Sequence, residues 1–225
     1  MKPPFKTQAI ILRRTNYGEA DRVISFLTPE RGKMSAIAKG VRKPKSKLAG
    51  GLELLAVCDV TFIEGRGDMA LVTSARLDQF YSNILHEYER MTLAFTFIKL
   101  INRAAETVSE PDFYYLLQGG LEYLNAKNID WQLTELWFRM HLRALLGHGL
   151  NVATDRFGVK LEADKLYHYD FSEQGFYEDP RGRFNEQHIK LLRLIATKTP
   201  AVLRQISGLE RALKDCLWLV GALES

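Results

Sequence analysis

Two short segments contain residue types that could do catalytic chemistry, but neither has the spacing that this chemistry needs. Residues 86–90, His-Glu-Tyr-Glu-Arg, begin like the helix of a zinc protease, yet Arg90 stands where the second zinc-binding histidine would be required. Residues 32–35, Gly-Lys-Met-Ser, are similar to the end of a phosphate-binding loop. Leu27, however, replaces its first glycine, and Met34 separates the lysine from the hydroxyl. Neither segment predicts a catalytic site.

The histidines and cysteines are too scattered to form a metal site or a catalytic pair. Cys58 and Cys216 are far apart, form no Cys-x-x-Cys motif and are expected to be buried core residues. The histidines lack metal-ligating neighbours at close spacing and are expected at the surface or at helix caps: His86, His141, His148, His168 and His188. With no paired carboxylates and no nucleophile elbow in the sequence, we predict a protein that is not an enzyme and has no cofactor or bound metal.

The chemistry that the sequence favours is the binding of polyanions. Residues 31–47 contain seven lysines and arginines and no acid, and with Gly32, Gly40 and Pro44 they are expected to form a flexible cationic loop across a small barrel. The basic charge is local, because residues 1–80 contain 14 Lys and Arg against 8 Asp and Glu (net +6), whereas the whole chain has +4. Such a field can steer an acidic partner. A surface loop kept basic for solubility is the simpler alternative.

Proteins that bind single strands combine cations that follow the phosphates with aromatic or guanidinium planes on which bases stack. Cations are abundant in the first eighty residues and aromatic residues are scarce, which favours contact through phosphates with weak sequence preference. Tyr17, beside a glycine in a turn, is the aromatic residue expected to be exposed. The predicted DNA-binding residues are Arg13, Arg14, Tyr17, Arg22, Arg31, Lys33, Lys39, Arg42, Lys43, Lys45 and Lys47.

Five short strands are predicted in the same part of the chain. Apolar or alternating runs bounded by turn residues place them at 6–14, 22–28, 33–38, 57–64 and 70–77. The glycines of residues 64–68 suit a hairpin turn between the last two strands. Five strands with one long connection between the third and the fourth fit a closed barrel of the OB type.

From residue 83 the hydrophobic period becomes helical. We expect helices at 85–108, from Pro111 onward, from a cap at Asp130 to about Gly147, and at 186–197 and 209–223. Short strands are expected at 166–171 and 175–178, within an irregular segment at 151–183. The predicted fold is therefore α+β. A five-stranded OB-fold barrel (1–80) is followed by an α-helical domain (81–225) with a small irregular β-containing insertion.

The sequence also favours a cytoplasmic protein without a membrane partner. The first residues lack the apolar core of a signal peptide, and no apolar run approaches the ~18–20 residues that a membrane span needs. Two isolated cysteines do not form a disulfide framework, so a reducing compartment is expected.

Three motifs in the first fifty residues resemble the N-terminal domain of bacterial RecO recombination mediators. They are Tyr-Gly-Glu-Ala-Asp-Arg at 17–22, Arg-Gly-Lys-Met-Ser at 31–35 and Ala-Lys-Gly-Val-Arg-Lys-Pro-Lys-Ser at 38–46. Residues 138–147 are similar to the family's helix that leads to a Leu-Gly-Tyr ending, here Leu-Gly-His at 146–148. The resemblance is strong to about Phe80 and weak after His148.

This resemblance implies an OB-fold domain, a helical domain and a role in DNA repair without bond chemistry. Family members bind single- and double-stranded DNA, anneal complementary strands, and work with RecR to load recombinase onto strands coated with single-strand-binding protein. They also dock the acidic tail of that binding protein. In this chain the resemblance assigns DNA binding to residues 31–47, and Arg139 and Arg143 are the candidates for tail docking.

Many members of the family carry four cysteines as a zinc site after the Leu-Gly-Tyr helix. A structural zinc needs four such ligands, and residues 151–183 contain no cysteine, so we predict no zinc there. Aromatic packing is expected to replace the metal, with candidates Phe157, Tyr167, Tyr169, Phe171, Phe176 and Tyr177.

Two other functions fit the same basic loop. An RNA-binding or ribosome-associated OB protein would differ by contacts to the 2′-hydroxyl. A protein-docking adaptor would bind an acidic peptide and ignore oligonucleotides.

Overall fold

The computed structural model describes residues 3–64, 69–108, 110–206, 208 and 210–223. The chain forms two compact units, Met1–Asn125 and Ala126–Ser225, which are described separately. The barrel ends with its last strand at Phe80, where the helical domain was predicted to begin. The first compact unit nevertheless continues through two helices to Asn125, so the units divide at a different point.

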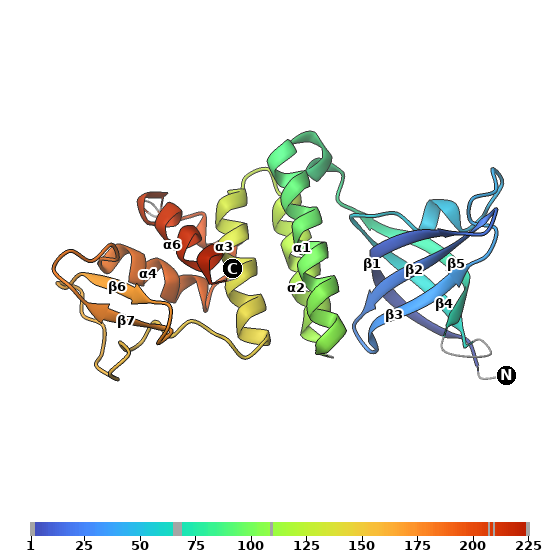
Figure 1. Ribbon diagram of the computed structural model, residues 1–225. Coiled ribbons are helices and arrows are strands. Elements are labelled where there is room, and N and C mark those ends of the chain that lie inside the picture. Colours follow the sequence, from blue (N-terminus) through green and yellow to red (C-terminus); the bar gives the residue numbers. More distant parts are fainter. Residues whose placement is uncertain (1–2, 65–68, 109, 207, 209, 224–225) are drawn as a thin grey trace. The chain divides into compact units, whose positions relative to one another are not determined.

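The first unit begins with a closed barrel of five strands (Figure 1). Its strands are β1 (Phe5–Tyr17), β2 (Asp21–Thr28), β3 (Gly32–Ala38), β4 (Ala56–Ile63) and β5 (Ala70–Phe80), in the order β1-β2-β3-β5-β4. All pairs are antiparallel except β3 with β5, which pair in parallel through Ala36 with Ala70 and Ile37 with Leu71. The predicted five-stranded OB-type barrel followed by helices is thus confirmed. Of the predicted turn at 64–68, only Glu64 lies within the described residues.

Apolar side chains on both faces of the barrel strands are buried, for two different reasons. Residues such as Ile24 and Phe26 point inward and form the barrel core. Ile10 and Leu27, which pair across β1 and β2, are also fully buried but lie outside that core cluster. Helices α1 (Tyr88–Thr107) and α2 (Asp112–Asn125) contact β1, β2 and β3, so they cover this part of the outer face. A short 3-10 turn, η2 (Ser82–His86), occupies the start of the helix predicted from residue 85.

The connection between β3 and β4 packs against the barrel. Val41 and Leu52 lie in the barrel core, and a 3-10 turn, η1 (Ala49–Gly51), contacts β5. The approach is close, because a Cβ atom added to Gly51 would lie 2.3 Å from the Ala75 carbonyl oxygen. Glycine at this position lets the connection pack directly on the β5 main chain.

The second unit is a small helical cluster with a two-stranded sheet. It contains α3 (Trp131–Leu145), β6 (Tyr167–Asp170), β7 (Gly175–Glu178), α4 (Glu186–Ile195), α5 (Pro200–Leu203) and α6 (Glu210–Ala222). Asp130 caps α3 as predicted, its side chain accepting a hydrogen bond from the Gln132 amide. The sequence did not predict α5. None of the helices in the described ranges is long and apolar enough to span a bilayer.

Aromatic rings do pack together around β6 and β7. Phe176 contacts Tyr169 and Phe184 edge to face, and Phe171 contacts Tyr169 in the same way. Phe157 does not join them, since 73% of its surface is exposed, and this part of the prediction is wrong. Its ring lies instead beside the guanidinium of Arg156, 4.8 Å from ring centre to Cζ.

Candidate nucleic-acid interface

Residues 39–47, called the basic loop below, are fixed to the barrel at their first half. The Val41 side chain is buried in the barrel core. The Arg42 amide donates to the Ala20 carbonyl at 2.9 Å, and its guanidinium donates to the Gly18 carbonyl at 3.3 Å. The Gly40 amide donates to the Asp21 carboxylate at 2.7 Å. The loop is therefore a set of turns held against the β1–β2 connection, rather than the flexible segment expected from its glycines and proline.

This anchoring leaves the charges of the basic loop pointing into solvent. All five cations are exposed: Lys39, Arg42, Lys43, Lys45 and Lys47. Within the described part of the chain, none of the five forms an ion pair with an acid. An array of unpaired surface cations attracts phosphate groups, since no internal carboxylate has to be displaced.

The other predicted cations lie on the barrel strands, and most have partners. Arg31 lies 3.4 Å from Glu64 and stacks on Phe5, and Lys33 lies 3.1 Å from Glu106. The remaining pairings are Arg14 with Glu53 at 3.6 Å and Arg22 with Asn16 at 3.2 Å, whereas Arg13 is exposed and has no ion pair among the described residues. No local pattern in the sequence predicts these pairs, because Glu64 and Glu106 lie 33 and 73 residues from their cations.

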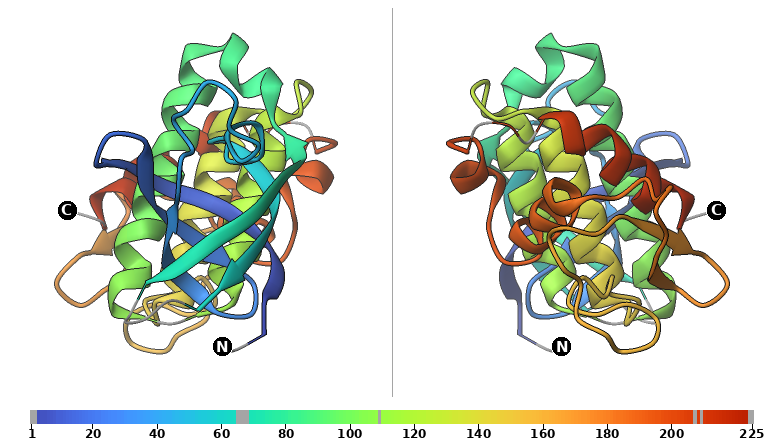
Figure 2. Two further views of the ribbon diagram at one scale, coloured as in Figure 1. Left: turned by 90° about the vertical axis from the view of Figure 1, so that its right-hand side faces the viewer. Right: turned by 90° about the vertical axis from the view of Figure 1, so that its left-hand side faces the viewer.

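Strand register gathers several of these residues on the outer surface of β1, β2 and β3. Arg13 lies opposite Ser25, and Ser25 lies opposite Ser35 on the next strand. Toward the basic loop, Tyr17 pairs with Asp21 and is 57% exposed, as predicted from its turn. Figure 2 (left) views the first unit from the barrel side. The structure thus brings strand cations and basic loop together on one domain.

The two candidates for tail docking lie on α3 in the second unit. Arg139 contacts Glu135 one turn earlier at 2.8 Å, and Arg143 donates to the carbonyl of Leu223, just after α6, at 2.8 Å. Their spacing of four residues puts them on the same helix face. Both guanidinium groups already have partners within this unit.

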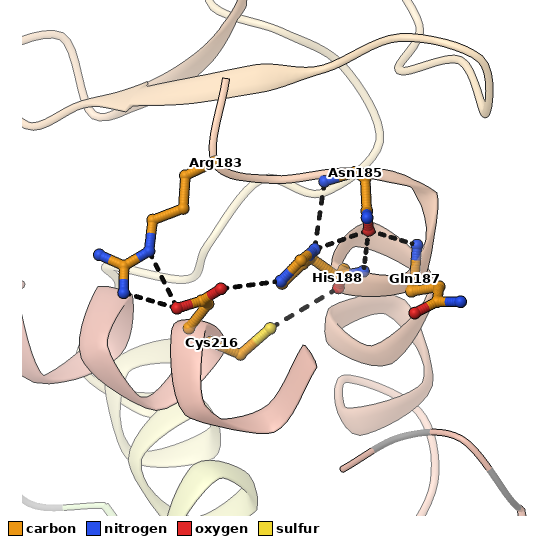
Figure 3. A network of polar contacts seen from close by, with 6 residues as sticks. Arg183, Asn185, Gln187, His188 and Cys216 are labelled. Atoms are coloured by element: carbon orange, nitrogen blue, oxygen red, sulfur yellow. Dashed lines mark hydrogen bonds and ion pairs between the residues drawn. The ribbon is translucent and has the colours of Figure 1, made fainter. Parts of the chain in front are cut away.

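A polar network joins α6, α4 and the segment just before α4 in the second unit (Figure 3). The buried His188 ring lies 2.7 Å from the Asn185 side chain and 3.2 Å from Asp215, which also pairs with Arg183. Burial opposes ionisation of Asp215, but the hydrogen bond and charge of Arg183, followed by those of His188, lower its pKa. Asn185 and His188 form a capping box at the start of α4, the structural role expected for a histidine in this sequence.

Neither cysteine has the surroundings of a nucleophile. The Cys216 thiol donates to the main-chain carbonyl of His188 at 3.8 Å, so this contact does not involve the imidazole ring. Burial raises the pKa of this thiol. Burial also raises the pKa of Cys58 to about 11. Among the described residues, no three His, Cys, Asp or Glu side chains gather where they could hold a metal ion.

Comparison with known proteins gives one consistent family. Residues 1–81 match the family model described as "Recombination protein O N terminal". Relatives named "DNA repair protein RecO" include those of Dehalococcoides mccartyi (37% identical), Heliobacterium modesticaldum (35%) and Desulfatibacillum aliphaticivorans (31%). Each alignment covers 64% of this chain and 52–57% of the relative, so the chain spans about half the length of the curated relatives it matches. The chain is thus related to the bacterial RecO proteins, and its N-terminal barrel belongs to their family.

Proposed function

We propose that this protein is an accessory factor of DNA repair and homologous recombination that binds single- and double-stranded DNA through its barrel. The observation that carries the proposal is the basic loop. Its five exposed cations have no acidic partner in the described chain, and the loop that carries them is attached to a barrel of the RecO N-terminal family by two backbone amides and the buried Val41. The names of the relatives support a role in repair.

The mechanism that we propose is charge neutralisation without bond chemistry. Two complementary strands repel each other through their phosphates, and a fixed array of cations can contact both and release their counterions. Lower repulsion favours pairing, so the chain would promote annealing. Contacts through phosphates give weak dependence on sequence.

The family relationship supports RecR and the acidic tail of single-strand-binding protein as protein partners in loading recombinase. A tail that docks on α3 has to compete with Glu135 for Arg139, since that ion pair is already formed at 2.8 Å. Reversal of charge at Arg139 is therefore expected to weaken binding of an acidic peptide without changing DNA affinity. Retained peptide binding would exclude this site.

The test is a titration of the full chain into a labelled 20-nucleotide single strand, followed by fluorescence anisotropy at several salt concentrations. We expect binding that weakens steeply with salt, together with weaker competition by RNA of the same sequence. Equal or better competition by RNA would favour the RNA-binding alternative, because only 2′-hydroxyl contacts separate the two at one site. Binding of an acidic peptide with no oligonucleotide binding at low salt would favour the adaptor.

A further inference from the structure

A cleft lies on the outer surface of the barrel beside the C-terminal end of α1. It has a volume of about 830 Å³, and its lining includes Arg31, Lys33 and Ser35 together with two acids, Glu64 and Glu106. A smaller hollow of about 240 Å³ adjoins it and is lined by Arg13, Ser25 and Asn102, again with Lys33 and Glu106. The Lys33–Glu106 pair therefore lies where the two hollows meet.

Lys33 is held in this cleft by two oxygen atoms of α1. Its ammonium donates to the Asn102 carbonyl at 2.9 Å and to the Glu106 carboxylate at 3.1 Å. The Lys33 side chain is only 19% exposed, whereas that of Glu106 is 62% exposed. The carbonyl contact is thus the anchored one, and the carboxylate is the solvated partner that can leave at low cost.

The position of the Glu106 carboxylate on Lys33 also suits another anion, because the lysine ammonium attracts any negatively charged oxygen. If a phosphate took the place of Glu106, Lys33 would keep its contact with the Asn102 carbonyl. The phosphate could also contact further groups that line the two hollows. These are the exposed Arg13 guanidinium, which has no ion pair in the described chain, and the hydroxyls of Ser25 and Ser35. Hydroxyl and guanidinium donors are the usual phosphate contacts of proteins that bind nucleic acids.

Lys33 of the cleft and Lys39 of the basic loop are connected by a single strand, β3. Lys33 and Lys39 are six residues apart along β3 and its end, roughly 20 Å at ~3.3 Å per residue. A single strand only a few nucleotides long spans this length, and one OB fold covers ~4–16 nucleotides. One strand can therefore contact both places.

We propose that this cleft is the second half of the DNA site, in which a backbone phosphate replaces the Glu106 carboxylate on Lys33. The inference rests on the proposed function. It separates two kinds of site on the barrel: the basic loop, which is open to DNA, and the cleft at Lys33, which an acid of the same chain occupies until DNA displaces it.

The test is a double-mutant cycle on the full chain with a labelled 20-nucleotide single strand. Glu106→Gln removes the competing charge, and Lys33→Gln removes the ammonium while keeping a donor for the Asn102 carbonyl. We expect Glu106→Gln to bind about two- to fivefold more tightly near 0.1 M salt, with a salt slope steeper by up to ~0.7, the value for one phosphate of a single strand. The gain is expected to vanish when Lys33→Gln is also present.

Glu89→Gln, on the exposed face of the first turn of α1, is the matched control for loss of one negative charge, and no change is expected. An unchanged affinity of Glu106→Gln would overturn the inference, as would an equal gain in the Lys33→Gln background or with Glu89→Gln. Thermal melts check that each variant is folded. Absence of binding by the unmodified chain would instead refute the proposed function, so the two failures are distinguishable.

Discussion

Replacement of Arg42, Lys43 and Lys45 by alanine is expected to weaken DNA binding with little effect on stability. All three side chains are exposed and lack ion pairs in the described chain, so no buried charge is left without a partner. Arg42→Ala removes the guanidinium hydrogen bond to the Gly18 carbonyl, but the loop stays in place because its other anchors remain. These are the Val41 side chain in the barrel core and the main-chain hydrogen bond from residue 42 to Ala20.

The size of the effect follows from counterion release. Each phosphate neutralised on a single strand contributes a salt slope of about 0.7, which near 0.1 M salt is a factor of roughly 5 in affinity. Three lost contacts give a loss of about 100-fold, and a slope shallower by about 2. The loss is expected to be similar for strands of different sequence, because phosphates carry no sequence information.

Anisotropy titrations at four or more salt concentrations measure both quantities. The matched control replaces Lys190, Lys198 and Arg204 in the second unit with alanine, which removes the same charge from exposed positions outside the barrel domain. We expect the control to retain affinity within about threefold, because salt screens exposed charges that do not contact the strand directly. If the loop variant kept its affinity and slope, or if the control lost as much, the assignment of the basic loop would be refuted.

Gly51→Ala is expected to lower the free energy of unfolding of the first unit by about 1–3 kcal/mol in denaturant titrations, because the new Cβ would overlap the β5 main chain; an unchanged midpoint would show that the connection can move away. Asp215→Asn should cost the second unit about 1–2 kcal/mol at pH 7 by removing the charge bound to Arg183. The pKa of Asp215 is lowered from its ordinary 3.8, so this stabilisation is present above that pH and is lost as the pH falls through the pKa of the folded state. If the difference in unfolding free energy between Asp215→Asn and the unmodified chain stayed constant down to about pH 2, the assignment would be contradicted. Cys58 and Cys216 are expected to resist a thiol reagent at pH 8 until the chain unfolds, and rapid labelling of the native protein would contradict their burial.

The barrel was predictable because its strand signals are local. Apolar runs and turn residues placed all five strands within three residues of their observed ends. β1 was predicted to stop at residue 14 but runs to Tyr17, because its polar end pairs with β2 as far as Asp21. The boundary of the compact units was not predictable in this way. The sequence predicts helices at 85–108 and from Pro111 onward, but it does not show that these helices cover Ile10 on the outer face of the barrel.

The candidate site was predictable in composition and not in pairing. The exposure of the basic loop follows from its charge alone. Its attachment to the barrel depends on the buried Val41, and a single apolar residue within a basic run does not predict burial. The division between open and acid-bound cations depends on tertiary structure, because Glu106 reaches Lys33 from 73 residues away. By contrast, the Glu135–Arg139 pair could have been read from its four-residue spacing on a helix.

Lysine footprinting tests most directly whether DNA lies on the basic loop. The full chain would be acetylated briefly with and without saturating single-stranded DNA, and modification of each lysine quantified by mass spectrometry. The account predicts strong protection of Lys39, Lys43, Lys45 and Lys47, with Lys190 and Lys198 of the second unit unchanged. Equal modification of the loop lysines in both samples, or protection confined to the second unit, would contradict it.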